Sequence, residues 1–334
     1  MMTARTVARA LRSLGKRAGR RAGTEAEWLR SRRGGADLAI FNDFMPPPYG
    51  GGNQFLLALV AELERRGLAV EVNRISPRTS ACLFNSFTFD LGRLRRFARP
   101  GCRMVHRVDG PVSLYRGFDD GTDRRVAEIN HEVAQATVVQ SRYSLEAHRG
   151  LGIELRAAVV IGNAVDPAIF HPPARRQPPQ GRRVRLIATS WSDNPNKGAD
   201  ILAWLDEHLD WRRYEMTFVG RTQATFRNIR VVGPVPSAQV AELLRAHDVY
   251  VAPSRNDPCS NALLEALACG LPAAYLASGG HPELVGEGGL PFCSAEELRT
   301  VLGRLVEELE ERRVAIRVPS LAEVADRYLE VLRG

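Results

Sequence analysis

Two carboxylates, Asp257 and Glu265, lie eight residues apart in a stretch whose pattern changes from strand to loop to helix. Residues 250–252 end an apolar run typical of a strand, residues 253–259 form a turn-rich loop, and leucines at helical spacing follow Ser260. Ser260 is a favourable N-cap, so the loop leads into the N-terminus of a helix. The free N–H groups and the positive dipole end at that point favour an anion such as a phosphate.

The two acids require different explanations. An acid near a helix N-terminus can simply stabilise the helix dipole, and for Asp257 this interpretation stands beside a functional one. Glu265 lies between Leu264 and Ala266 in an apolar helix, and a buried carboxylate needs a partner. We therefore expect Glu265 to be functional or paired, with a surface-facing side chain as the alternative.

This stretch resembles the Glu, seven residues, Glu motif of the family 4 (group 1) retaining glycosyltransferases, with Asp257 and Glu265 in the two acid positions. Downstream, residues 278–283 read Ser-Gly-Gly-His-Pro-Glu and are similar to the family's Gly-Gly-x-Pro-Glu segment. The resemblance implies that Glu265 binds the ribose of a nucleotide-sugar. It also implies that Asp257, as a catalytic residue, and the backbone after it hold the sugar and the diphosphate; the donor-binding residues there are Cys259, Ser260 and Asn261. A small apolar filler is the alternative for Cys259.

Lys197 precedes Gly198 at the start of an expected helix, where a positive charge opposes the helix dipole. The pair resembles the family's Lys-Gly, whose lysine neutralises the donor diphosphate. The resemblance therefore implies a catalytic role for Lys197, and a surface lysine is the alternative.

The family usually carries an arginine a few residues before this lysine, where the chain has Ser190-Trp191-Ser192. One phosphate contact is therefore missing, and Arg221, after the expected strand 216–220, is a candidate substitute. An exposed loop arginine is the alternative. The donor-binding residues expected from this region are Ser190, Ser192, Gly220 and Arg221.

The chain also carries a glycine-rich loop between an expected strand at residues 38–41 and an expected helix from residue 55. Strand, loop, helix and the next strand at residues 69–72 open a parallel βαβ unit. Glycines let the backbone approach a ligand closely, although a tight turn is the alternative. The loop resembles the first loop of the same transferase family, which implies that Gly51 and Gly52 lie near the donor phosphates or the acceptor.

An expected strand at residues 102–108 ends in Asp109-Gly110. In the family a histidine at this place points into the cleft, and two alignments are possible: His106 or Asp109. We favour Asp109, as a catalytic residue that contacts the sugar, because the carboxyl end of a parallel strand faces the ligand. His106 and Arg107 are weaker candidates for the acceptor side, and a structural histidine is the alternative for His106.

The net charge of +8 lies entirely in residues 1–33, which hold ten Lys or Arg and two acids. The rest of the chain is neutral, which argues against a nucleic-acid binder. The basic segment could form a helix on an anionic membrane surface, a flexible arm or a transit peptide. The five cysteines are scattered, as in a reducing cytosol, so we expect a cytoplasmic protein with the inner face of the membrane as a further contact. Because the chain lacks an Asp-x-Asp motif, we expect no required metal.

Alternating strands and helices, twice over, predict an α/β fold with two Rossmann-like domains that face a central cleft. The resemblance implies that this is the GT-B fold, and it covers roughly residues 36–310. We expect a basic arm at residues 1–35, an N-terminal acceptor domain at 36–172, a Pro- and Arg-rich linker at 173–183, a C-terminal donor domain at 184–318 and a last helix at 319–334 that packs on the first domain.

The function that the resemblance implies is retaining transfer of a sugar from a nucleotide-sugar, with a UDP- or GDP-linked donor and no further cofactor. The acceptor class stays open between a glycan, a lipid-linked sugar and a small molecule. Two alternatives remain. One is a sugar-nucleotide epimerase on the same fold, and the other is a degenerate, non-catalytic sugar-nucleotide binder, which the shorter Asp257 and the missing arginine favour.

Overall fold

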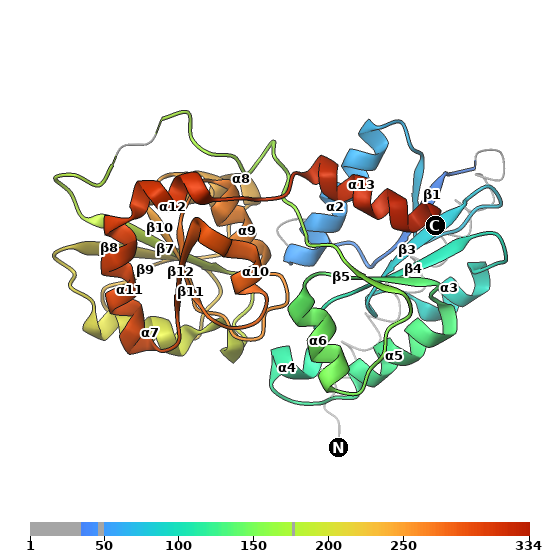
Figure 1. The fold of residues 1–334 in the computed structure, drawn as a ribbon, viewed down its shortest axis with the longest axis horizontal. Coiled ribbons are helices and arrows are strands. Elements are labelled where there is room, and N and C mark those ends of the chain that lie inside the picture. Colours follow the sequence, from blue (N-terminus) through green and yellow to red (C-terminus); the bar gives the residue numbers. More distant parts are fainter. Residues whose placement is uncertain (1–34, 46–49, 176–177) are drawn as a thin grey trace, which may run out of the picture.

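The computed structural model describes residues 35–45, 50–175 and 178–334. The basic segment at residues 1–33, for which membrane contact was predicted, lies outside these ranges. Two parallel sheets, each with six strands, form the two halves of the molecule (Figure 1). The α/β fold with two Rossmann-like halves, predicted from the sequence, is confirmed.

The first sheet has the strand order β2-β1-β3-β4-β5-β6. Its central strands are buried along their whole length, as expected for a parallel sheet with helices on both faces. Its strands are β1 (Leu38–Phe41), β2 (Val70–Val72), β3 (Ala81–Asn85), β4 (Arg103–Val108), β5 (Ala136–Val139) and β6 (Ala158–Val160). Its helices are α2 (Gly51–Arg65), α3 (Leu91–Phe97), α4 (Val112–Arg116), α5 (Thr122–Val133) and α6 (Arg142–Gly150).

The second sheet has the order β12-β11-β10-β7-β8-β9. Its strands are β7 (Val184–Ser190), β8 (Tyr214–Gly220), β9 (Arg230–Val232), β10 (Val249–Ala252), β11 (Ala273–Leu276) and β12 (Gly289–Phe292). Its helices are η2 (Pro195–Lys197), α7 (Ala199–His208), α8 (Ser237–Arg245), α9 (Asn261–Ala268), α10 (His281–Val285), η3 (Gly286–Gly288), α11 (Ala295–Glu307) and α12 (Leu309–Ala315).

The last helix, α13 (Leu321–Arg333), leaves the second half and packs beside α2 of the first (Figure 1). Ser320 and Glu323 form a capping box at its start, and its apolar face joins the core of the first sheet. The rings of Tyr328 and Phe55 lie 5.8 Å apart in that core. The chain therefore ties its two halves together through its C-terminal end as well as through the segment between β6 and β7.

The strands of both sheets carry their functional candidates at the carboxyl ends. Asp109 follows β4, Gln140 follows β5, Trp191 follows β7 and Pro253 follows β10. Because parallel strands end at one edge of a sheet, these residues gather where the two halves face each other. None of the described helices is long and apolar enough to cross a membrane.

Candidate functional site

A cavity of about 360 Å³ lies between the two halves. The first half contributes Gly50–Gly52, Asp109, Tyr115 and their neighbours, and the second contributes Ser190–Ser192, Lys197 and residues 257–262. A smaller cavity of about 100 Å³ shares Gly51, Ser190 and Asn261 with the first and is lined by Glu265 and Gly220. The two cavities therefore form one continuous site, and Lys197 and Glu265 both face it.

The N-terminus of α9 points into this site. Ser260 caps the helix by accepting a hydrogen bond from the backbone N–H of Leu263, at 3.4 Å. The predicted turn from strand to loop to helix therefore exists at the predicted residue. Gly279 fixes the loop from behind, because it has a φ of +64° and an added Cβ would lie 2.4 Å from the carbonyl oxygen of Asp257. The glycine pair at 279–280 thus lets the chain pass directly behind the loop that carries Asp257.

Across the cleft, the N-terminus of α2 begins at Gly51. Its N-cap residue, Gly50, has no side chain, and its first turn holds no acid. An added Cβ on Gly51 would lie 2.5 Å from the side chain of Asn261, the first residue of α9. Gly51 therefore lets the N-termini of α2 and α9 approach one another, and both bring free N–H groups to the site.

Lys197 and Asp257 form an ion pair, with 2.7 Å between Nζ and Oδ2. Their side chains are 22% and 7% exposed, and the ammonium also lies 5.1 Å from the ring centroid of Tyr115. Burial lowers the pKa of the Lys197 amine, but Asp257 outweighs it and the pKa is raised. Burial likewise raises the pKa of Asp257, but Lys197 and His281 outweigh it and the pKa is lowered. Both groups are charged at neutral pH.

The choice of lysine at position 197 is unusual for this chain. The sequence has 46 Lys and Arg, of which only Lys16 and Lys197 are lysines. Lysine is a compact point charge, whereas arginine is a planar fork that holds a carboxylate in two places. Lys197 follows Pro195 in the short helix η2, and Gly198 after it adopts a φ of +77° against the carbonyl of Pro253. The local fold therefore aims a single point charge at the cleft.

Glu265 faces the smaller cavity without a hydrogen-bond partner among the described residues. Burial raises its pKa to about 8. The sequence analysis expected a buried acid to be paired or functional, and the structure supplies no ion pair for it. A ligand with hydroxyl groups would satisfy this carboxylate.

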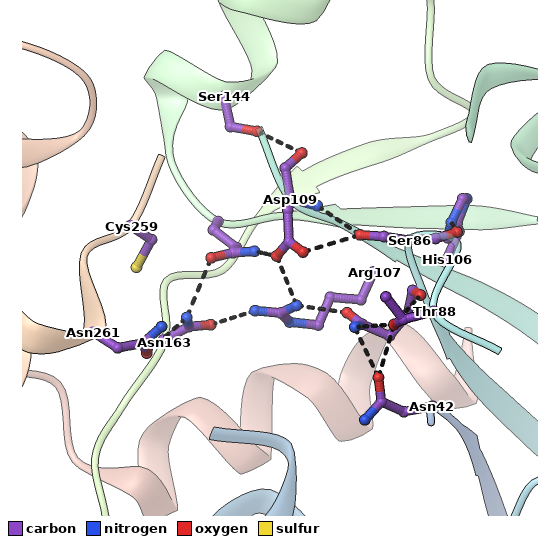
Figure 2. Close-up of polar contacts among 12 residues, drawn as sticks. Asn42, Ser86, Thr88, His106, Arg107, Asp109, Ser144, Asn163, Cys259 and Asn261 are labelled. Atoms are coloured by element: carbon purple, nitrogen blue, oxygen red, sulfur yellow. Dashed lines mark hydrogen bonds and ion pairs between the residues drawn. The ribbon is translucent and has the colours of Figure 1, made fainter. Parts of the chain in front are cut away.

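Asp109 lies on the opposite wall, held by three side chains of the first half (Figure 2). Its carboxylate accepts hydrogen bonds from Arg107 at 2.9 Å and from Ser86 at 3.1 Å, and a further one from Gln140. The side chain is still 44% exposed, toward the cleft. Of the two alignments considered, the structure therefore puts Asp109 in the cleft.

His106 and Arg107 do not reach the cleft, which corrects their assignment to the acceptor side. The His106 ring is fully buried, 2.8 Å from the carbonyl oxygen of Ser86 and stacked on Phe84. Burial lowers its pKa to about 4, so the ring is neutral. Arg107 is also fully buried. Both lie inside β4, whose two faces are covered, and only the residue beyond the end of that strand is free to face a ligand.

The remaining predicted donor residues divide into two groups. Ser190, Ser192, Cys259, Ser260, Asn261, Gly51 and Gly52 line the larger cavity, and Gly220 lines the smaller one. Arg221 lines neither; its guanidinium is exposed and lies 4.5 Å from the ring centroid of Trp191. Arg221 therefore does not replace the missing arginine in the free protein. Burial raises the pKa of the Cys259 thiol to about 12, so the thiol is uncharged where it lines the cavity.

The sequence analysis missed several residues of the site. Trp191 lines both cavities, Tyr115 lies under Lys197, and Gln140 bonds Asp109. Gln140 directly follows β5, so the rule that ligands lie beyond the carboxyl ends of strands could have found it. Tyr115 carried no comparable signal, because it lies in the short helix α4 and does not directly follow a strand.

The residues that the structure describes contain no cluster of three His, Cys, Asp or Glu side chains able to hold a metal ion. The charges that face the cleft are instead Lys197, Asp257, Asp109 and Arg116, together with the two helix N-termini. Arg116 is paired with Asp120 at 2.6 Å. An anion in this site would therefore be met by Lys197 and by backbone N–H groups.

The fold and this interlobe site define the GT-B class. Solved structures with the same fold include sucrose-phosphate synthase from Thermosynechococcus elongatus, with a TM-score of 0.68 and 16% identity over 89% of this chain and 98% of that one. Another is Anabaena HepE, solved in complex with UDP-glucose, with a TM-score of 0.66 and 16% identity over 89% of this chain and 99% of that one. These likenesses establish the shared fold.

Residues 186–308 match the family described as "Glycosyl transferases group 1". A MMP alpha-(1->4)-mannosyltransferase of Mycolicibacterium hassiacum is 29% identical over 247 residues, which cover 66% of this chain and 58% of that protein. A D-inositol 3-phosphate glycosyltransferase of Streptosporangium roseum is 40% identical over 60 residues, or 18% of this chain and 14% of that protein. The chain thus spans less than two thirds of the length of these curated relatives, and its second half carries the group 1 glycosyltransferase pattern.

Proposed function

We propose that this chain is a glycosyltransferase that moves a sugar, with retention of its anomeric configuration, from a nucleotide-diphosphate sugar to an acceptor. One observation carries the proposal. A lysine, two helix N-termini and a carboxylate without a partner line one continuous interlobe site. These are the groups that a diphosphate and a ribose diol need. The group 1 match over residues 186–308 and the UDP-glucose bound to a protein of the same fold support the same assignment.

In this proposal the diphosphate lies between Lys197 and the N-termini of α9 and α2. The ribose hydroxyls donate hydrogen bonds to Glu265, and the base lies beyond it, toward Pro234 and Val235 of the smaller cavity. UDP- and GDP-linked sugars are the donors to test first. The sugar then projects into the larger cavity, where Asp257 and Asp109 contact its hydroxyl groups.

The rate enhancement comes mainly from stabilising the charge that develops on the leaving diphosphate. Lys197 and the fixed N–H groups of α9 are already oriented for this charge, so little reorganisation accompanies bond cleavage. We assign this task to protein groups and propose no metal and no cofactor, because the chain lacks an Asp-x-Asp motif. We assign no side chain as a nucleophile.

The acceptor enters from the first half of the molecule, where Phe87, Thr88, Tyr115 and Arg116 form the wall beside Asp109. An aromatic wall with a few polar groups suits a sugar ring, which presents apolar faces and hydroxyl edges. A sugar-containing or lipid-linked acceptor is therefore proposed. Cytoplasmic location and membrane contact through residues 1–33 stay predictions from the sequence.

A panel of nucleotide-sugars tests the proposal by thermal shift and by product analysis with and without candidate acceptors. A donor that binds raises Tm by mass action, and the Glu265→Gln and Lys197→Met variants are expected to lose that rise. Glu297→Gln, at an exposed position in the first turn of α11, is a matched control that should keep the rise in Tm. NMR of the product should show the anomeric configuration of the donor. Undiminished donor shifts in both site variants would refute the assignment of the site.

A non-catalytic nucleotide-sugar binder is the second candidate. Two observations favour it: Asp257 is already engaged by Lys197, and Ser190-Trp191-Ser192 stands where the related motif has an arginine. Donor binding without turnover on any acceptor would select this alternative, whereas isomerised donor without acceptor would select an epimerase.

A further inference from the structure

A buried arginine lies directly beneath Asp109. The Arg107 side chain, which Figure 2 shows beside Asp109, is fully buried. Its guanidinium lies 5.2 Å from the ring centroid of Phe55. A buried cation is costly unless it is paired and hydrogen-bonded. Among the described residues, the carboxylate with which Arg107 forms an ion pair is Asp109, at 2.9 Å. The charge of Arg107 is therefore balanced by an acid that faces the cleft.

The hydrogen bonds of Arg107 fix the guanidinium from two sides. Its first terminal nitrogen donates to Asn85 at 2.6 Å and to Asp109 at 2.9 Å, and its second donates to Asn163 at 2.9 Å. A planar guanidinium that is held at three points cannot rotate. The oxygen of Asp109 that it contacts is thereby held at a set position.

Ser86 and Gln140 complete the support of the Asp109 carboxylate. Ser86 donates to Oδ2 at 3.1 Å, whereas Arg107 and Gln140 both donate to Oδ1. Ser86 also accepts from the Asp109 backbone N–H at 3.2 Å. The Asp109 side chain nevertheless stays 44% exposed and lines the cavity. The support therefore orients the carboxylate without covering it.

The same network crosses to the other half of the molecule. Asn163 accepts from Arg107 and donates to Gln140 at 3.2 Å and to Asn261 at 3.1 Å. Asn261 is the first residue of α9, whose N-terminus is assigned to the diphosphate. A continuous chain of side chains therefore joins the Asp109 carboxylate to the donor end of α9 (Figure 2).

We propose that Arg107 is a positioning residue. It orients the Asp109 carboxylate toward the transferred sugar and fixes its position relative to the N-terminus of α9. This inference rests on the proposed transfer reaction and assigns to Arg107 no contact with substrate. It differs from a purely structural role in one respect: the effect of changing Arg107 on transfer must pass through Asp109.

A double-mutant cycle measures that dependence in the full chain. The variants are Arg107→Lys, Asp109→Asn and the double variant, with kcat/KM measured for the donor and acceptor found in the panel. Lysine keeps the positive charge but lacks the planar guanidinium that donates several hydrogen bonds in fixed directions. Arg107→Lys should therefore lower kcat/KM about tenfold or more. In the Asp109→Asn background the same change should alter kcat/KM by no more than about twofold.

Arg182→Lys is the matched control, because Arg182 forms a two-point ion pair with the buried Asp248 away from the cleft. It should lower Tm without changing kcat/KM by more than about twofold. If Arg107→Lys does not fold, Asn163→Ala replaces it in the cycle, since it removes the acceptor of the second guanidinium nitrogen.

Equal losses from Arg107→Lys in both backgrounds, or a loss no larger than that of Arg182→Lys, would overturn the inference while leaving the transferase assignment standing. An unmodified chain that transfers no sugar with any donor would remove the proposed function itself, and with it the reaction that Arg107 serves.

Discussion

Donor binding should strengthen as the pH rises, because only the ionised Glu265 carboxylate can accept a hydrogen bond on each oxygen from the two ribose hydroxyls. Burial raises the pKa of this carboxyl to about 8 in the free protein. Each pH unit below that value costs about 1.4 kcal/mol, so the donor should bind roughly tenfold more weakly at pH 7 than on the alkaline plateau. At pH 6 the loss should be roughly a hundredfold.

The direction of this pH dependence follows from the protonation states of Glu265 in the free and the bound protein. The free carboxyl is protonated at neutral pH, and a ribose diol donates two hydrogen bonds that favour the carboxylate. Binding therefore lowers the pKa of Glu265, and between the free and the bound pKa each binding event releases a proton. Burial lowers the pKa of the neighbouring His281 and raises that of Tyr250 to about 12, so both shifts move these groups away from the interval between pH 7 and pH 9 in which proton release is measured.

Isothermal titration calorimetry in two buffers with different ionisation enthalpies measures the released proton. At pH 7 we expect about 0.9 proton per bound nucleotide-sugar, and at pH 9 about 0.1. The probe should be the intact nucleotide-sugar, because its pyrophosphate diester does not itself titrate near neutrality. The Glu265→Gln variant has no titratable proton at this position. Nucleotide-sugar binding to it should therefore release no proton, and its affinity for the nucleotide-sugar should be the same at pH 7 and pH 9. A wild-type affinity that is independent of pH, or proton uptake on binding, would refute this reasoning.

Three further predictions concern stability and local geometry. Since the folded state holds the Glu265 proton from about pH 4.5 to about pH 8, stability should fall by at most about 5 kcal/mol over that range, and Glu265→Gln should raise Tm at pH 8 but not at pH 5. Lys197→Met should cost about 3–5 kcal/mol in urea unfolding because it leaves Asp257 buried and unpaired, and adding Asp257→Asn should recover most of that loss; an additive double variant would contradict the pairing. Gly220→Ala should cost at least about 2 kcal/mol and abolish donor binding, because its Cβ would lie 1.8 Å from the carbonyl of Ser190. Gly233→Ala, with open space around it, is the control and should stay within about 0.5 kcal/mol.

The sequence pattern could predict those features of the molecule that are determined by residues close together in the chain. Apolar runs followed by turn residues predicted the two sheets, and Ser260 marked the start of α9 because capping is decided within three residues. The strand-end rule also favoured Asp109 over His106, and the structure places Asp109 in the cleft and buries His106 inside a covered strand.

What pattern could not predict is which distant side chains meet. The partners of Asp109 come from β3, β4 and the end of β5, and nothing in their spacing along the chain links Ser86 to Gln140. Arg221 was a candidate for the donor site by its position after β8, but its guanidinium lies over Trp191 and lines neither of the two cavities that hold Asp109 and Glu265, because a rotamer depends on tertiary neighbours. The Lys197–Asp257 pair was hidden for the same reason, as sixty residues separate the two.

The paired charges determine which groups of the proposed donor site could attract a diphosphate without the arginine that the related motif carries near residues 190–192. In the free protein Asp257 balances Lys197, Arg107 balances Asp109, and Glu265 is protonated at neutral pH. An arriving diphosphate therefore meets a cleft without excess positive side-chain charge, and Lys197 is shared with an acid only 2.7 Å away. The attraction must come in larger part from the N–H groups of α9 and α2, which are fixed dipoles that no carboxylate neutralises. The close approach of those two helix ends, which glycine at position 51 permits, is therefore as necessary to the proposed donor site as its lysine.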